Sequence, residues 1–251
     1  MPLRILRRGI FLMIVFNRRS FSIAATVIFA AGLAACGDPE PEQRKAFMAF
    51  LQGMIDRPGV HIMNPKADDD KTFGDYTKHY AVILDFNKGM KTVSEQFGEK
   101  LKQIGADRAT ERSIEQLVEH RSDLVAVGDA AGKMKSAIEA QLATADAQHA
   151  ALKQPDDLKK VYDIAFDKLV TQPARGAAKI ESVLVDGVKA SLQLVDYIIA
   201  NRPKVTVSGS QIRANDAKTL NEVNELLKGH TAAGAKFAEA TRDMHRIVDG
   251  N

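Results

Sequence analysis

The thiol of Cys36 is the side chain with the clearest chemistry in this chain. Cys36 is the only cysteine, and it closes the sequence Leu-Ala-Ala-Cys at residues 33–36. An apolar run at residues 21–31 precedes this tetrapeptide, and Arg18 and Arg19 stand before the run. A basic segment, an apolar segment and small residues before a cleavage point form the pattern of a secretory signal. We therefore expect Cys36 to be the lipid-modified first residue of a mature bacterial lipoprotein.

Two other interpretations of Cys36 are weaker. A buried core cysteine behaves as a small hydrophobic side chain, but such a residue has no reason to follow a secretion-type apolar run directly. An uncleaved transmembrane anchor needs about 20 apolar residues, and the stretch at 21–35 is shorter than that. Residues 37–42 (Gly-Asp-Pro-Glu-Pro-Glu) are typical of a polar tether, as a lipid-modified terminus requires.

The segment before the apolar run looks like a second signal. A short apolar stretch at residues 10–16 follows Arg4, Arg7 and Arg8. One signal suffices for export, and translation from Met13 would leave a conventional one, so we expect the start to lie there. The expected organisation is a cleaved signal peptide (1–35), a lipid-anchored tether (36–42) and a single α-helical domain (43–251).

The net charge of +3 comes from the presequence. Residues 1–35 contain five arginines and no acidic residue, so 35 basic residues less five leaves 30 against 32 acidic ones, a net charge of about −2. Nucleic-acid binding needs a basic stripe and stacking platforms, and this chain has no tryptophan. We therefore expect no nucleic-acid partner. A single cysteine allows no internal disulfide, so the fold must be stabilised by core burial.

The histidines do not have the spacing of a metal site. They are His61, His79, His120, His149, His230 and His245. Asp75 with His79, and Asp146 with His149, would share a helix face at spacings of four and three residues. We interpret both as solvated surface pairs, and we expect neither a metal ion nor a cofactor.

Nucleophilic catalysis also lacks its usual motifs, because the chain has no nucleophile elbow and no glycine-rich phosphate loop. Ser208 and Ser210 fall in an expected hairpin turn. Phe73, Tyr76 and Tyr80 could line a ligand groove between helices, yet an aromatic stripe at helical spacing is more typical of a core. We therefore predict no catalytic residue, and we expect that the chain is not an enzyme.

Apolar residues recur at three- and four-residue spacing through most of the domain, which predicts α-helices. The expected helices span about 42–56, 68–104, 110–153, 156–172, 174–200 and 216–248. The second and third are long and should pack antiparallel, with Gly128 and Ala131 where their backbones could approach closely. Pro173 should end the fourth helix, and Asp216 should cap the last one.

A change of pattern near the end of the chain predicts a β-hairpin. Residues 205–207 (Val-Thr-Val) and 211–213 (Gln-Ile-Arg) flank the turn sequence Ser-Gly-Ser. An isolated hairpin is only marginally stable, so it should lean on the helices. The expected fold is all-α: an up-and-down bundle of about six helices, two of them long, with one small β-hairpin near residues 204–214.

Several short segments resemble a known family. They are 43–47 (Gln-Arg-Lys-Ala-Phe), 50–52 (Phe-Leu-Gln), 149–154 (His-Ala-Ala-Leu-Lys-Gln), 156–159 (Asp-Asp-Leu-Lys), 165–166 (Ala-Phe), Lys168, 170–171 (Val-Thr), 173–174 (Pro-Ala) and 196–198 (Asp-Tyr-Ile). In this order they are similar to the YiaF-like family of uncharacterised bacterial lipoproteins. The family has no known catalytic or binding residues to carry over. The resemblance implies a lipid-anchored envelope protein.

These observations predict a helical bundle that faces the periplasm and is held at the cell envelope by acyl chains on Cys36. Gly37 follows the cysteine, and by resemblance to enterobacterial lipoproteins this favours the outer membrane over the inner one. A structural or protein-binding role is expected, with another envelope protein as partner. The alternative is a periplasmic module that binds a small ligand or lipid between the aromatic-bearing helices.

Overall fold

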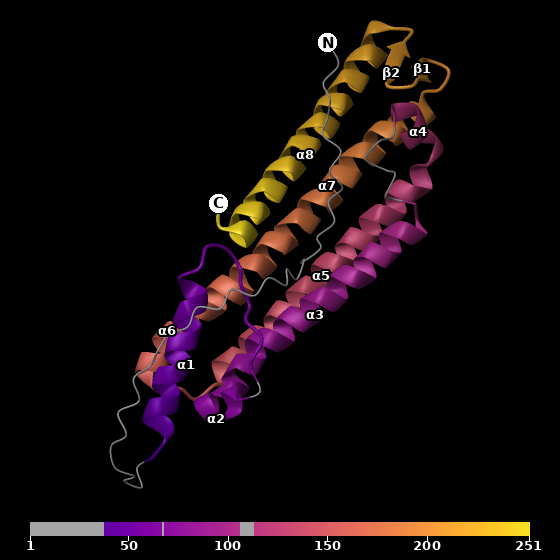
Figure 1. Cartoon of the computed structure of the whole chain (residues 1–251). Helices are drawn as coiled ribbons and strands as arrows, with labels where there is room; N and C mark the ends of the chain where they lie inside the picture. Colours follow the sequence, from indigo (N-terminus) through magenta and orange to yellow (C-terminus); the bar gives the residue numbers. More distant parts are fainter. Residues whose placement is uncertain (1–37, 67, 106–112) are drawn as a thin grey trace. The chain divides into compact units, whose positions relative to one another are not determined.

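The computed structural model describes residues 38–66, 68–105 and 113–251, and this part of the chain is an all-α bundle with one small hairpin, as predicted (Figure 1). The elements are α1 (Glu40–Ile55), α2 (Asp69–Phe73), α3 (Tyr76–Gln103), α4 (Ile114–Glu119), α5 (Arg121–Ala151), α6 (Asp156–Phe166), the π-helical turn η2 (Asp167–Thr171), α7 (Gln172–Ala200), β1 (Val205–Ser208), β2 (Gln211–Ala214) and α8 (Ala217–Asp249). None of the helices in the described ranges is long and apolar enough to cross a membrane.

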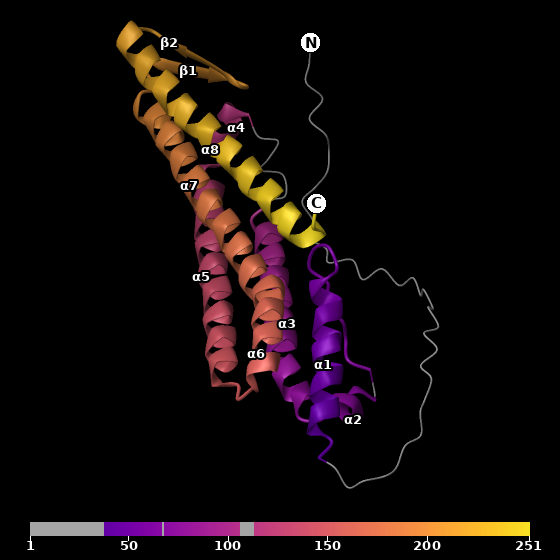
Figure 2. The ribbon, with the colours of Figure 1, turned by 90° about the vertical axis from the view of Figure 1, so that its left-hand side faces the viewer.

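Four long helices run side by side within the unit Glu40–Asn251 (Figures 1 and 2). Helix α5 lies between α3 and α7, and α7 lies between α5 and α8 (Figure 1). Helix α1 packs against α6 and α2. Short connections favour antiparallel neighbours, and residues 152–155 join α5 to α6, which continues through η2 into α7. Helices α7 and α8 are joined by the hairpin.

The two helices predicted to be longest are each interrupted. Gly74, with φ of +54°, separates α2 from α3, and a side chain at this position would meet the amide of Gln43 on α1. The helix predicted from 110 to 153 is divided at His120, where φ is −108° and ψ is 35°. Its predicted start at residue 110 lies outside the described residues, and Ser113 caps α4 by accepting from the Gln116 N–H.

Gly128 serves a different contact from the one predicted. The sequence placed it against the preceding long helix. In the structure, a Cβ at this position would lie 3.0 Å from Cγ1 of Val188, so Gly128 is where α5 approaches α7. Helical periodicity gives the face of a residue but not which neighbour covers it, so this partner was not determined by the pattern.

Pro173 does not end a helix, contrary to the prediction. Proline has no N–H to donate to the carbonyl four residues earlier. The chain accommodates this loss with the π-helical turn η2, and helical backbone continues from α6 into α7. The wider turn also carries Lys168, whose ammonium donates to the carbonyls of Ile55 and Arg57 at the end of α1.

The buried hydrophobic side chains fall into two clusters at different levels of the bundle. The first cluster is formed by α1, α2, α3, α6, η2, the later part of α5 and the start of α7, and includes Phe47, Leu51, Tyr80, Ile83, Ile138, Leu158, Tyr162 and Ala174. The second cluster is formed by α4, the hairpin and the adjoining parts of α5, α7 and α8, and includes Ile114, Leu124, Val188, Leu194, Val195, Val205 and Val223. Ala130, Ala131 and Ala240 are buried but belong to neither cluster.

The hairpin is confirmed and it does lean on the helices. Strands β1 and β2 pair antiparallel, with Val205 opposite Ala214 and Ser208 opposite Gln211. Gly209 supplies the positive φ, +60°, that the turn needs. Its N–H donates to a carboxylate oxygen of Glu115 at 2.7 Å, which fixes the turn on α4.

Candidate functional site

The predicted lipidation residue, Cys36, and the predicted signal at 1–35 lie outside the described residues. The predicted tether at 36–42 lies partly inside them. Helix α1 begins at Glu40, so the last three residues of that tether are helical. Among the described residues, only 38 and 39 of the predicted tether are therefore non-helical.

A polar cluster joins the last turn of α5 to α6. Nε2 of His149 lies 2.8 Å from Oδ1 of Asp163, and Nζ of Lys159 lies 2.7 Å from the other carboxylate oxygen. The centroid of the His149 ring lies 4.2 Å from that of the Phe166 ring and 5.3 Å from that of the Tyr162 ring. These five residues, His149, Lys159, Tyr162, Asp163 and Phe166, are called the His149 cluster below.

The surface pair predicted between Asp146 and His149 is wrong. Asp146 is exposed, whereas His149 is largely covered and turns to Asp163 on the next helix. Burial favours a raised pKa for Asp163, but hydrogen bonds from Lys159 and His149 outweigh it and hold this pKa below its ordinary value. The carboxylate therefore stays charged and binds both side chains, which stabilises the α5–α6 turn.

Asp75 and His79, the other predicted pair, each bind a different residue. Asp75 pairs with Lys78 at 2.6 Å, and Nδ1 of His79 lies 3.2 Å from the side-chain nitrogen of Gln154. Burial lowers the pKa of His79, which favours the neutral ring that can accept this hydrogen bond. The Tyr162 hydroxyl donates to the His79 carbonyl at 2.7 Å, so His79 adjoins the His149 cluster.

The His149 cluster holds α3, α5 and α6 together rather than presenting a reactive group. Its histidine and aspartate are already engaged with each other, and the aspartate is also bound by Lys159. Within residues 38–66, 68–105 and 113–251, no group of three or more His, Cys, Asp or Glu side chains is arranged to hold a metal ion. Three of its residues, His149, Lys159 and Phe166, lie in the segments 149–154, 156–159 and 165–166 that carry the family resemblance.

A second histidine contact joins α7 to α8. Oγ of Ser191 lies 2.9 Å from the Gly187 carbonyl and 3.0 Å from Nδ1 of His230. With its proton on the Gly187 carbonyl, the hydroxyl accepts from the His230 ring, and the two side chains link α7 to α8. This pair is therefore a helix-to-helix contact. Ser208 and Ser210 lie at the hairpin turn, as predicted.

The aromatic stripe of Phe73, Tyr76 and Tyr80 is core. All three side chains are buried in the first cluster. The Phe47 ring on α1 lies 5.6 Å from the Phe73 ring and 5.7 Å from the Tyr76 ring. The hydroxyl of Tyr80 donates to the Met63 carbonyl at 2.6 Å. The rings thus fill the space between α1 and α3 with one another.

Glu181 is a buried acid that the sequence interpretation missed. Its side chain on α7 is only 5% exposed, and its Oε2 has no hydrogen-bond partner among the described residues. Burial raises the pKa of Glu181 to about 7. A signal was present in the sequence, because Glu181 lies seven residues from both Ala174 and Val188, and a spacing of seven places all three on one helix face.

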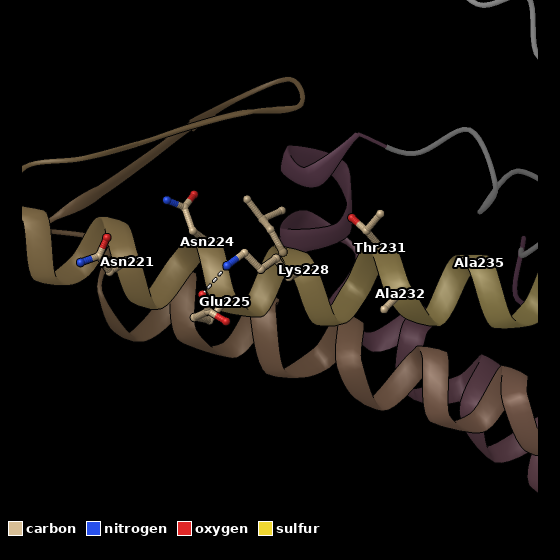
Figure 3. Close-up of a pocket in the computed structure, with 8 residues that line it drawn as sticks. Asn221, Asn224, Glu225, Lys228, Thr231, Ala232 and Ala235 are labelled. Atoms are coloured by element: carbon tan, nitrogen blue, oxygen red, sulfur yellow. Dashed lines mark hydrogen bonds and ion pairs between the residues drawn. The ribbon is translucent and has the colours of Figure 1, made fainter.

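The solvent face of α8 carries a shallow depression (Figure 3). Its lining is Asn221, Asn224, Glu225, Leu227, Lys228, Thr231, Ala232 and Ala235. All of these residues belong to one helix, and Lys228 reaches back to Glu225 at 2.6 Å. A surface with amides, one ion pair and small side chains suits contact with another protein better than enclosure of a small molecule. We call it the α8 face.

Comparison with known proteins places this chain in a family. A family model described as a protein of unknown function, DUF3053, matches residues 23–245. The chain belongs to that family. The chain is 28% identical over 222 residues to the uncharacterised protein YiaF of Escherichia coli K12 and to YiaF of Shigella flexneri, with 88% of this chain and 93% of each relative covered. No solved structure matches the chain.

Membership in the DUF3053 family and the match to YiaF confirm the YiaF-like family, while lipid modification stays a prediction. The matched segment includes the His149 cluster, Glu181 and the α8 face. The family is one of unknown function, so membership assigns a role to none of these residues.

Proposed function

We propose that this chain is an exported protein, acylated on Cys36 and held at the cell envelope facing the periplasm, where its bundle binds another envelope protein. The observation that carries the proposal is the sequence Leu-Ala-Ala-Cys at 33–36, which follows a basic and then an apolar segment and ends just before the first helix. We assign the bundle no catalytic role.

The short connection to α1 supports an anchor at this position. Three residues separate Cys36 from Glu40, and an extended chain covers at most about 3.6 Å per residue, so the connection spans about 14 Å or less. Each buried methylene contributes about 0.8 kcal/mol to membrane binding, so several acyl chains hold firmly without help from the protein surface. Gly37 after the cysteine favours the outer membrane over the inner one.

The α8 face supports the binding part of the proposal. Helix α8 is packed against α7 on one side and presents the α8 face to solvent on the other. The alanines at 232 and 235 let another backbone approach, while Asn221 and Asn224 offer amide donors and acceptors for specific contacts.

Loss of acylation in the variant Cys36→Ala is the first expected result. Labelled palmitate should enter the wild-type protein, and it should be absent from Cys36→Ala, because the chain has no other cysteine. Inner and outer membranes are separated before the label is counted, and the label should be found in the outer-membrane fraction. The variant Asp38→Asn keeps Cys36 and serves as the control that retains the label. An unlabelled wild-type protein would contradict the proposal.

The binding part is tested separately with a photo-crosslinking residue at position 224 or 228 of the acylated protein. One discrete adduct with an envelope protein is expected from either position. The control places the same residue at Lys160, which is exposed on α6, where no such adduct should form. Equal adducts from all three positions, or none from 224 and 228, would remove the α8 face as the binding surface.

A further inference from the structure

The buried Glu181 lies between the two hydrophobic clusters. On α7, Ala174 belongs to the first cluster and Val188 to the second. On α5, Ile138 belongs to the first and Leu124 to the second. Between these levels the buried side chains that belong to neither cluster are Glu181, the small Ala130, Ala131 and Ala240, and Met244.

The register of α5 against α7 shows what lies opposite Glu181. Gly128 approaches Val188, and Arg121 binds Asp196 with N–O distances of 2.5 and 3.0 Å. Both contacts fit one antiparallel register, in which a step of seven residues along each helix places position 135 level with Glu181. The charged group there is the Lys135 ammonium, which lies 3.9 Å from Glu139 on its own helix.

The register of α8 against α7 gives the neighbours on the other side. Nζ of Lys179 binds Asp243 at 2.8 Å. A Cβ added at Gly187 would lie 3.8 Å from the Cβ of Ala233. These contacts place the buried Ala240 level with Glu181. The charged residues of α8 near this level are Lys236, Glu239, Arg242 and Asp243, and the last is bound by Lys179 and Arg246.

None of these charged groups compensates the carboxyl. Burial is the cause of the raised pKa of Glu181, with no contribution from Lys135 or from the charges of α8. The neutral acid can remain in the interior, whereas an ionised carboxylate without a partner is costly there. Lys135, the cation of α5 at this level, instead lies 3.9 Å from Glu139 on its own helix.

We propose that Glu181 is a proton-sensitive joint of the bundle: its neutral carboxyl lets α5 and α7 pack between the two clusters, and loss of its proton loosens that contact. The joint concerns the bundle alone, so it holds whether or not Cys36 is acylated and whatever the α8 face binds.

The direction of the pH effect follows from the two protonation states. The pKa of Glu181 is about 7 in the folded chain against an ordinary value of 4.5. Between these values the folded state holds a proton that the unfolded state has lost, so stability falls as pH rises. The full stabilisation by the neutral carboxyl of Glu181 is present when the pH is below its ordinary pKa of 4.5. This stabilisation is lost once the pH exceeds the pKa of about 7 in the folded chain. Each pH unit within this window changes the unfolding equilibrium about tenfold.

The test compares urea unfolding of the full chain between pH 5 and 8 for the wild type, Glu181→Gln and Glu139→Gln. The glutamine side chain introduced by Glu181→Gln stays neutral, so this variant should lack most of the loss in stability that the wild type shows. Glu139 is 56% exposed on α5, and its variant should follow the wild type. If Glu181→Gln fails to fold, Glu181→Leu is used in its place, because leucine is also neutral and of similar size.

Hydrogen exchange gives the local readout. Amide protection in residues 131–138 of α5 and 177–184 of α7 should fall from pH 6 to pH 8 in the wild type, after correction for the intrinsic rate. It should fall much less in Glu181→Gln, and protection within the first cluster should change little in either. Identical pH profiles for the wild type and Glu181→Gln, in unfolding and in exchange, would overturn the proposal.

Discussion

The variant Tyr162→Ala should lower the free energy of unfolding by about 3–5 kcal/mol, the range for removing a large aromatic side chain from a core. Tyr162 is 0% exposed and lies in the first cluster. Its ring contacts the rings of His149 and Phe166, and its hydroxyl donates to the His79 carbonyl at 2.7 Å. One substitution therefore removes contacts that link α3, α5 and α6.

Tyr162→Phe separates the hydrogen bond from the packing. Burial raises the pKa of Tyr162, so the hydroxyl remains protonated and able to donate. The variant leaves the His79 carbonyl without the hydrogen bond from the Tyr162 hydroxyl, which should lower the free energy of unfolding by about 1–3 kcal/mol. Ile164 is on the same helix but 55% exposed, and Ile164→Ala should change stability by less than about 0.5 kcal/mol. Urea unfolding at constant pH measures all three. Equal losses for Tyr162→Ala and Ile164→Ala would show that the ring is not in the core.

Gly59→Ala should destabilise the bundle by at least about 2 kcal/mol, because an alanine would combine a left-handed backbone with a steric clash. Gly59 has φ of +71°. A Cβ at this position would meet the Val248 carbonyl oxygen and would lie 2.8 Å from the carbonyl carbon of Asp249. The adjacent hydrogen bond, from the Val60 N–H to the Val248 carbonyl at 2.9 Å, ties this loop to the end of α8. The substitution should therefore release the end of α8 from the loop after α1.

The same substitution at Gly53 is the matched control and should have the opposite sign. Gly53 lies inside α1, and a Cβ there meets nothing within 4 Å. Alanine is favoured over glycine in a helix by about 1 kcal/mol, so Gly53→Ala should stabilise the protein by up to that amount. Thermal unfolding of both variants under one condition gives the comparison. A Gly59→Ala variant as stable as the wild type would mean that the loop does not contact α8 in this way.

Features set by neighbours in the chain were predicted well. The chain is helical where apolar residues recur at three- and four-residue spacing. The hairpin turns at Gly209 and the last helix has its cap, as the sequence predicted. The Asp216 carboxylate accepts from the Thr219 N–H at 2.8 Å, as a helix cap should. Such features depend on residues a few positions apart, so composition and spacing are sufficient to identify them.

Features that depend on a distant partner were not predicted. Pro173 signals a break, yet packing on both sides keeps the helix continuous through a π-helical turn. His149 has an acid three residues earlier, but it binds Asp163, which the turn between α5 and α6 brings closer. In both cases a tertiary contact overrode a local preference.

The sequence by itself determined the helical class, the hairpin and the resemblance to the YiaF-like family, and it contains the pattern that makes Cys36 the expected anchor. Only the tertiary structure decided that Gly128 approaches α7, that His149 pairs with Asp163 and that Glu181 lies buried between two hydrophobic clusters. The physical reason is that periodicity fixes which residues share a helix face, whereas the register between helices fixes what each face meets. That register is set by contacts between residues far apart in the chain.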